Sequence, residues 1–325
     1  MALARDALRT LLAEARIPGA ALAVIDKDAI DVQVAGAANL ETGAAVEADT
    51  LFDAASLSKP VFALAVLQLI DAGRLALDSR LSEHVPDYVP NDPRAQTATV
   101  GQALSHSTGL PNWRSVETPL ETRFDPGTCF GYSGEAITWL QKAVEAVTGE
   151  ALDDVVRRGV FEPLGMTASS YLWQPLLESR YAAPHDAEQK VSAKRKPAEA
   201  MAAYSLQTTA ADYGRFLRAV LSGGGLPPAT AAQWLTPHVA VEEDGSVAWG
   251  LGWGLEPALG TFFQWGDNDR YKAFAIGSIR ARSAVVVLTN GFNGMSIVPA
   301  LVEDILPGRH PCFDWLGYER HAPRG

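Results

Sequence analysis

The chain has 325 residues, enough for one large domain or two medium ones around a sizeable buried core. Its composition, 47% hydrophobic and 20% charged residues with 28 Gly and 20 Pro, is that of an ordinary globular protein and excludes a disordered or fibrous one. The 27 basic and 38 acidic residues give a net charge of -11, and the only basic cluster is residues 194–196 (KRK) beside Lys190. Because nucleic-acid binding needs a basic footprint, we expect no nucleic-acid partner.

The cysteines, the histidines and the N-terminal residues indicate which bound groups and which cellular location to expect. Cys129 and Cys312 are too few and too far apart for a disulfide framework or a zinc site, so we expect two free thiols. The histidines other than His106 lack the spacing of metal ligands, and we expect neither a metal ion nor a cofactor. No window holds the roughly 18 apolar residues of a membrane span. Residues 1–17 alternate charged residues with Ala and Leu, which predicts an amphipathic helix instead of a signal peptide and hence a cytoplasmic protein without a membrane partner.

Strand patterns gather at the two ends of the chain. Residues 20–25 and 30–35 are short apolar or alternating runs joined by Asp26-Lys27-Asp28, which predicts a β-hairpin. Four similar strands are predicted towards the C-terminus, at residues 247–253, 261–265, 271–276 and 284–288. Residues 297–305 predict a closing helix packed on the sheet.

Between these ends, helical patterns and loops rich in Pro and Gly dominate. The simplest arrangement is an α/β protein in which residues 1–74 and 205–325 form a discontinuous domain, an antiparallel sheet built from both termini and flanked by helices. Residues 75–204 form an inserted, mostly helical domain, and the active site lies between the two domains.

Residues 56–72 predict a central helix, because residues 61–70 are apolar except for Gln68. Gly73 ends this helix, and Pro60 fits only in its first turn. Ser56 and Lys59 then lie three residues apart on one face of the helix N-terminus. A desolvated amine can activate a serine hydroxyl, and a helix N-terminus favours an oxyanion. The Ser-x-x-Lys spacing alone fits a helix-capping serine equally well.

Further segments follow in an order typical of one enzyme family. They are residues 52–59 (FDAASLSK), 73–78 (GRLALD), 104–111 (LSHSTGLP), 126–133 (PGTCFGYS), 145–149 (EAVTG) and 163–166 (PLGM). Together they resemble class C β-lactamases and the related DD-peptidases and esterases, from about residue 17 to residue 305. The resemblance implies the β-lactamase/DD-peptidase-like fold, with Ser56 as the nucleophile and Tyr132 beside Ser56 and Lys59, relaying a proton through a phenol of lowered pKa. Ser58 and Ser133 are interpreted as local structure.

The family's third motif is a strand carrying Lys-Thr-Gly or His-Thr-Gly, and Gln264-Trp265-Gly266-Asp267 occupies its place here. The resemblance therefore assigns these four residues to substrate binding. It gives the oxyanion hole to the backbone amides of Ser56 and Asp267, with Gly266 letting the backbone approach the substrate closely.

Two positions depart from the family pattern. Gly134 stands where the family has an Asn that binds the amide carbonyl of the substrate, and Trp265 stands where it has a Thr or Ser that binds the carboxylate of a β-lactam. Both changes remove groups that recognise acylamino substrates. A Trp-Gly pair in the third motif also resembles the family VIII carboxylesterases. The sequence therefore predicts a serine hydrolase that cleaves small-molecule carboxylic esters through an acyl-Ser56 intermediate.

Other functions of the same fold stay open: a D-amino-acid peptidase or amidase, a weak β-lactamase, an acyltransferase, or a catalytically inactive penicillin-binding-like binding or sensor protein. An α/β-hydrolase is excluded because the chain has no Gly-x-Ser-x-Gly elbow; residues 131–135 (GYSGE) fail at the last position. The oligomeric state is left open.

A few further residues have two interpretations. For His106 we favour a structural hydrogen-bonding role over that of a triad base. For Arg270 we favour a solvated loop position over the binding of an anionic group at the pocket mouth. Trp113, Trp173 and Tyr181 are candidates for lining an acyl pocket, although buried aromatic residues more often belong to a core.

Overall fold

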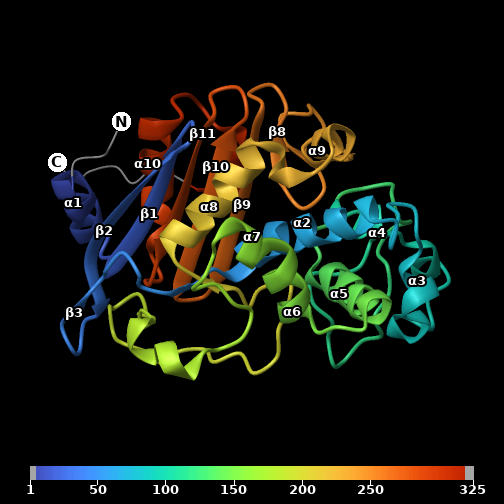
Figure 1. The fold of residues 1–325 in the computed structure, drawn as a ribbon, viewed down its shortest axis with the longest axis horizontal. Helices are drawn as coiled ribbons and strands as arrows, with labels where there is room; N and C mark the ends of the chain where they lie inside the picture. Colours follow the sequence, from blue (N-terminus) through green and yellow to red (C-terminus); the bar gives the residue numbers. More distant parts are fainter. Residues whose placement is uncertain (1–4, 319–325) are drawn as a thin grey trace.

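The computed structural model describes residues 5–318, and one large antiparallel sheet dominates them (Figure 1). Its strand order is β3-β2-β1-β11-β10-β9-β8-β7-β6. These strands are β1 (Gly19–Asp26), β2 (Ala29–Asn39), β3 (Ala44–Ala45), β6 (Val239–Ala240), β7 (Ala248–Trp249), β8 (Gly254–Glu256), β9 (Thr261–Asn268), β10 (Tyr271–Ser278) and β11 (Ser283–Thr289), while β4 (Phe52–Asp53) pairs separately with β5 (Gln207–Thr208). Because β1 pairs with β11, the prediction of a sheet built from both termini is confirmed.

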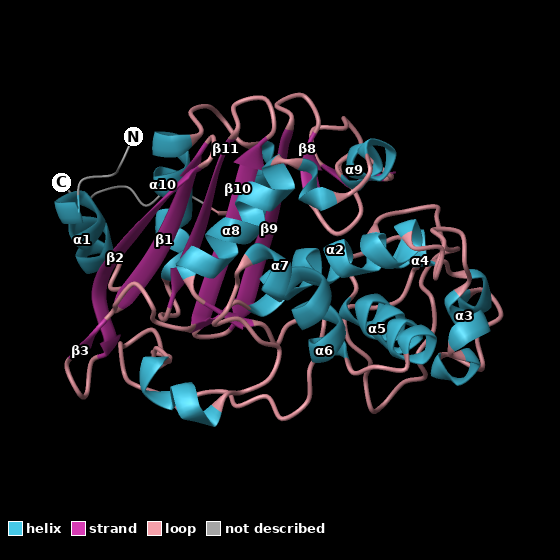
Figure 2. Cartoon of the chain, in the orientation of Figure 1, coloured by secondary structure: helices cyan, strands magenta, loops and turns pink. Residues whose placement is uncertain are grey.

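Helices cover both faces of the sheet (Figure 2). Along β1, Ala21 and Ala23 join one hydrophobic cluster while Leu22 and Val24 join another, as the two-residue period of a strand requires. The first cluster includes α8 (Ala210–Leu221), and the second includes α1 (Arg5–Glu14) and α10 (Val298–Ile305). The predicted N-terminal helix and closing helix are therefore present, although residues 1–4 of the former lie outside the described part of the chain.

The predicted strand at residues 247–253 is wrong in one respect. The structure has two short strands there, β7 and β8, joined by a turn. Gly252 in that turn has φ +92°, and a Cβ at this position would lie 2.5 Å from the Cβ of Ala63. The chain therefore turns because its backbone must pass closely over the central helix, which a strand pattern alone does not reveal.

The remaining helices lie mainly beyond one end of the sheet (Figure 1). They are α2 (Ser58–Asp71), α3 (Leu81–His84), α4 (Val100–Leu104), α5 (Gly134–Thr148), α6 (Leu152–Val156), α7 (Glu162–Leu164), α9 (Pro228–Trp234) and α11 (Pro311–Leu316). One hydrophobic cluster continues from the sheet through α2 into α5 and α6. The domain boundaries after residues 74 and 204 therefore remain a prediction.

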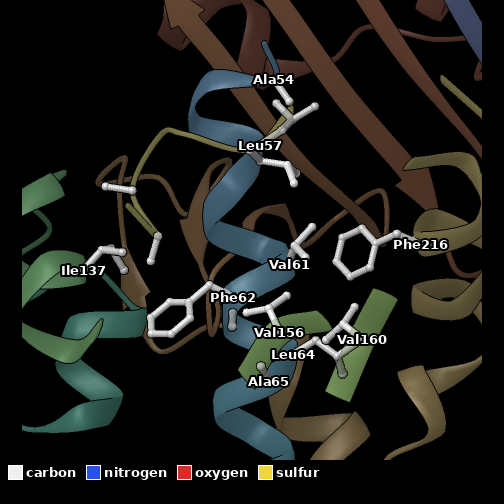
Figure 3. Packing of buried hydrophobic residues seen from close by; sticks show 14 of the residues in the cluster. Ala54, Leu57, Val61, Phe62, Leu64, Ala65, Ile137, Val156, Val160 and Phe216 are labelled. Atoms are coloured by element: carbon white, nitrogen blue, oxygen red, sulfur yellow. The ribbon is translucent and has the colours of Figure 1, made fainter. Parts of the chain in front are cut away.

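Helix α2 is buried over most of its length, as its apolar sequence predicts. Figure 3 shows Val61 facing Phe216 on one side of the helix and Phe62 pointing towards Ile137 on the other. All four side chains are at most 1% exposed. The helix ends at Asp71, and Gly73 follows with φ +68°. This packing holds the N-terminal end of α2 against the sheet, where the candidate site lies.

Candidate active site

Ser56 lies in a 3-10 turn, Ala55–Leu57, that leads directly into α2. The sequence placed Ser56 in the α-helix itself; the difference arises because Ala55 adopts a positive φ of +48°, with its amide donating to Asp53 Oδ1 at 2.9 Å. The Ser58 hydroxyl donates to the Ala55 carbonyl at 2.5 Å and accepts from the Leu206 amide at 2.9 Å. Ser58 therefore fixes the turn that carries the half-buried Ser56.

Lys59 is brought against Ser56 by the first turn of α2. Its Nζ lies 2.8 Å from Ser56 Oγ and donates to the Ala203 carbonyl at 2.7 Å. The side chain is buried, and burial lowers the pKa of the Lys59 amine from 10.5 to about 7, because an ammonium ion is poorly solvated there. A substantial fraction of the amine is then neutral near pH 7 and can accept a proton from Ser56.

Tyr132 completes the group predicted from the sequence. Its hydroxyl accepts from Gln264 Nε2 at 2.9 Å and is hydrogen-bonded to Ser56, while Lys59 Nζ lies 4.8 Å from the ring centroid. The expectation of a lowered phenol pKa is wrong: burial raises the pKa of Tyr132, and the hydrogen bonds to Ser56 and Gln264 offset this only in part. The phenol therefore keeps its proton at neutral pH and is suited to donating it.

Strand β9 passes directly behind the Ser56 turn. A Cβ on Gly266 would lie 2.5 Å from the Ala54 carbonyl oxygen. The absence of a side chain at Gly266 is thus required by the approach of the turn that carries the serine, a reason different from the close substrate approach expected from the sequence. Asp267 turns its carboxylate to Lys272, with an N to O distance of 2.6 Å, so its side chain is paired within the protein.

Trp265 belongs to an aromatic group on the Tyr132 side of the site. Its ring centroid lies 4.7 Å from that of Tyr132, 5.3 Å from that of Trp315 and 6.0 Å from that of Trp249. These contacts hold the phenol in place and present an apolar edge where the family pattern has a hydroxyl.

His106 is fully buried beneath Tyr132, with 4.3 Å between the ring centroids. Its Nδ1 accepts from the Ser133 amide at 3.1 Å, and Ser133 in turn caps α5 by accepting from the Ala136 amide at 2.9 Å. Burial and the nearby Lys59 lower the pKa of His106, so the imidazole is neutral. These contacts support the structural interpretation of His106 and of Ser133.

A pocket of about 630 Å³ borders the segment that contains Ala203, whose carbonyl accepts from Lys59. It is lined by Tyr88, Trp113, Arg114, Glu135, Thr138, Arg195, Met201, Tyr204 and Asn268. The Trp113 indole occupies the place of a side chain at position 134, because a Cβ on Gly134 would lie 2.5 Å from one of its ring carbons. Sequence reasoning missed Tyr204 and Asn268, and it noted Arg195 only as part of the single basic cluster.

Three other candidates from the sequence lie elsewhere. Trp173 and Tyr181 stack with ring centroids 3.9 Å apart in a small cluster with Leu51, so they do not line this pocket. Arg270 pairs with the neighbouring Asp269 at 3.1 Å in the turn between β9 and β10, and it is likewise not among the lining residues.

Comparison with protein families matches residues 4–305 to the beta-lactamase family. The chain belongs to this family. Members of the β-lactamase family are serine hydrolases, and the chain is 31% identical to "Penicillin-binding protein 4" of Amycolatopsis lactamdurans over 93% of its own length and 87% of the relative. It is also 31% identical to "Esterase EstB" of Burkholderia gladioli, over 47% of this chain and 46% of that one. "Lovastatin esterase" of Penicillium rubens is 25% identical, over 71% and 70% of the two chains.

Solved structures support the β-lactamase/penicillin-binding-protein fold. An octameric penicillin-binding protein homologue from Pyrococcus abyssi superposes with a TM-score of 0.81 at 21% identity, covering 94% of this chain and 78% of that one. The D-alanine carboxypeptidase AmpC from Burkholderia cenocepacia gives a TM-score of 0.75 at 20% identity, covering 87% and 91%. The fold predicted for this β-lactamase family member is therefore confirmed.

Within residues 5–318, no three or more His, Cys, Asp or Glu side chains are grouped so that they could hold a metal ion. Cys129 is exposed, Cys312 is buried, and both are free thiols. Within the same residues, none of the helices combines the length and the apolar character needed to cross a membrane. The cytoplasmic location remains a prediction.

Proposed function

We propose that the protein hydrolyses small carboxylic esters through an acyl-enzyme intermediate on Ser56. The observation that carries this proposal is the contact between Ser56 Oγ and Lys59 Nζ, 2.8 Å apart, with the pKa of the buried amine lowered to about 7. A serine hydroxyl is a weak nucleophile until a neighbouring base takes its proton, and Lys59 is such a base.

In the acylation step, neutral Lys59 takes the Ser56 proton while Oγ bonds to the ester carbonyl carbon. The carbonyl oxygen becomes an oxyanion, for which the backbone amides of Ser56 and Asp267 are the proposed donors. The packing of Gly266 on the Ala54 carbonyl supports this pair, since it holds β9 close to the serine turn.

The leaving group needs a proton when its bond to the acyl carbon breaks. Tyr132 is the proposed donor, because its hydroxyl is hydrogen-bonded to Ser56 and its raised pKa keeps it protonated. The phenol then recovers a proton from the Lys59 ammonium. In deacylation Lys59 accepts a proton from the attacking water and returns it to Ser56 Oγ, so that the bond from Oγ to the acyl carbon breaks and Ser56 leaves as a hydroxyl.

Two features favour esters over acylamino substrates. The space for an amide-binding side chain at position 134 is filled by the Trp113 indole, and Trp265 offers a ring where a hydroxyl would bind a carboxylate. A hydrogen bond to a charged group contributes roughly 1.5–3 kcal/mol. Esters with good leaving groups need neither contact and place a smaller demand on Tyr132.

The names of the relatives support two candidate functions. Two relatives are named as esterases, which agrees with the proposal. The relative named "Penicillin-binding protein 4" matches 93% of the chain, and this favours a D-amino-acid peptidase as the second candidate.

One substrate comparison separates these candidates. The value of kcat/KM is measured on one preparation for p-nitrophenyl butyrate, nitrocefin and a D-alanyl-D-alanine peptide. We expect the ester to be preferred by roughly a hundredfold, corresponding to about 3 kcal/mol at 1.4 kcal/mol per decade. Comparable or higher values for the β-lactam or the peptide would refute the esterase assignment.

A further inference from the structure

Three residues of strand β9 lie one after another along the candidate active site. Gln264, Gly266 and Asn268 share a face because strand residues alternate. Gln264 donates to the Tyr132 hydroxyl at 2.9 Å, Gly266 lies against the serine turn, and Asn268 donates to the Tyr204 carbonyl at 3.2 Å. The Tyr132 hydroxyl and the Tyr204 carbonyl therefore lie towards opposite ends of this stretch of β9, with Gly266 and the serine turn between them.

This order indicates where the leaving group and the acyl group of the substrate bind. Under the proposed function, on which this inference rests, the leaving group departs on the side of its proton donor, Tyr132. The acyl group then extends the other way, into the pocket that Tyr204 and Asn268 line.

Aromatic walls shape this pocket. The rings of Trp113 and Tyr204 meet edge to face with centroids 5.4 Å apart, and Trp113 is 46% exposed. Such walls accept an apolar or flat chain.

Two arginines line the same pocket, and they differ in how they are paired. Arg114 donates to Glu135 through both Nε, at 3.0 Å, and Nη2, at 2.7 Å, so its charge is matched by a carboxylate. Arg195 stacks on the Tyr204 ring, with Cζ 4.9 Å from the centroid, and its nearest carboxylate oxygen, on Asp53, is 3.8 Å away. That distance is too long for a hydrogen bond.

Asp53 therefore holds Arg195 in place without occupying its donors. Asp53 Oδ1 accepts from the Ala55 amide at 2.9 Å and from Asn268 Nδ2 at 2.7 Å, whereas Oδ2, the oxygen that faces Arg195, has no hydrogen-bond partner. The Arg195 side chain is 43% exposed, so its guanidinium can be reached from the pocket.

The two lysines beside Arg195 point to another surface. Lys194 donates to the Glu178 carbonyl at 3.1 Å, and Lys196 donates to the Glu178 carboxylate at 2.7 Å. Of residues 194–196, only Arg195 lines the pocket, and the two lysines supply matched controls.

We propose that Arg195 makes this enzyme selective for esters whose acyl group ends in a carboxylate, that is, monoesters of dicarboxylic acids. The apolar part of the acyl chain lies between Trp113 and Tyr204, and the terminal carboxylate receives two N–H bonds from the Arg195 guanidinium. This anion-binding role falls to Arg195 instead of Arg270, which pairs with Asp269.

The test compares substrates of equal length that differ in one charge. Mono-p-nitrophenyl esters of adipic, pimelic and suberic acid are measured beside the corresponding p-nitrophenyl methyl diesters. We expect kcat/KM for the best monoanionic ester to exceed that of its neutral partner at least tenfold, and this ratio to shrink as salt rises. Arg195→Met should bring the ratio close to 1, and Arg195→Lys should retain part of it, whereas Lys194→Met and Lys196→Met should leave it unchanged.

A wild-type ratio at or below 1 for all three chain lengths, or an Arg195→Met protein that keeps the wild-type ratio, overturns the proposal while leaving the esterase assignment intact. If no ester is turned over, the proposed function is wrong. The role of Arg195 is then tested by measuring ligand binding. Calorimetry with monomethyl adipate should then give a Kd at least tenfold higher for Ser56→Ala/Arg195→Met than for Ser56→Ala. An equal Kd, or no binding to Ser56→Ala, overturns the role of Arg195.

Discussion

At the scale of single residues, Lys59 controls the proton chemistry because its amine must be neutral to accept the Ser56 proton. Its lowered pKa, about 7, predicts that kcat/KM for p-nitrophenyl butyrate rises with pH through about 7 and is level above it. Below pH 7 the amine becomes an ammonium ion and the base is lost. A profile measured from pH 5 to pH 9 tests this, and activity that falls as pH rises through 7 would exclude Lys59 as the base.

The same shift in pKa has a consequence for stability. Because the pKa of Lys59 is about 7 in the folded protein and near 10.5 in the unfolded chain, the unfolded chain binds more protons between these values. The Lys59 contribution therefore destabilises the fold fully below pH 7 and is relieved as pH rises towards 10.5. At 1.36 kcal/mol for each pH unit, the cost is on the order of 5 kcal/mol.

Lys59→Met should abolish ester hydrolysis without lowering stability at pH 6. The lost bond to the Ala203 carbonyl offsets part of the gain. Denaturant titrations of both proteins at pH 6 and pH 9.5 measure the difference, and the variant's advantage should shrink at the higher pH. An advantage that grows with pH would contradict this account.

Tyr132→Phe removes the proposed proton donor while keeping the ring that packs on Trp265 and His106. We expect kcat for an alkyl ester such as ethyl butyrate, whose leaving alkoxide needs a proton, to fall by about 10²–10⁴-fold with little change in KM, because the phenol acts on the transition state. Steady-state kinetics and circular dichroism on the same preparation check this. A near-normal kcat would leave Lys59 and water to carry the proton without the tyrosine.

At the scale of secondary structure elements, the site depends on how β9 approaches the serine turn. Gly266→Ala places a Cβ 2.5 Å from the Ala54 carbonyl oxygen, where only backbone could move away. We expect a loss of about 1–3 kcal/mol in stability together with a fall in kcat, since the turn must shift. Gly159→Ala is the control, because its Cβ would meet only the end of the Gln68 side chain. Full activity of the Gly266→Ala protein would refute the requirement for close packing.

A double-mutant cycle tests the contact between Gly134, at the start of α5, and Trp113. Gly134→Asn alone should destabilise the protein, because the new Cβ would lie 2.5 Å from the Trp113 ring, and adding Trp113→Ala should remove that penalty. The expected coupling is about 1–3 kcal/mol. The double variant should also gain activity on acylamino substrates relative to esters. Additive stability changes would show that the indole does not fill the position of the side chain.

Much of the fold and of the candidate active site could be predicted from the sequence, because local residue patterns indicate it. The apolar runs of β1 and β11 and the uninterrupted apolar face of α2 each give a periodic signal, and the spacing of Ser56 and Lys59 holds over one helical turn. The rest depends on distant contacts. No local pattern indicates that Trp113 fills the space at Gly134, that Gly252 turns over α2, or that burial raises the pKa of Tyr132.

At the scale of the whole molecule, the site joins segments that are far apart in the chain. The serine turn and β9 come from the two sequence-distant parts of the sheet region, and Tyr132 and Tyr204 come from the stretch between them. The site can therefore form only when these segments pack together. It also places the positive charge of Arg195 in a chain whose net charge is -11, where an anionic substrate is otherwise repelled.

The central claim is that Ser56 is the residue acylated during turnover. Mass spectrometry of the protein treated with a fluorophosphonate probe tests it most directly, with peptide mapping of the adduct and Ser56→Ala as the control. We predict one adduct per chain, on Ser56, and a folded Ser56→Ala protein that is neither labelled nor able to hydrolyse p-nitrophenyl butyrate. A label on another residue, or ester hydrolysis by the Ser56→Ala protein, would contradict the account.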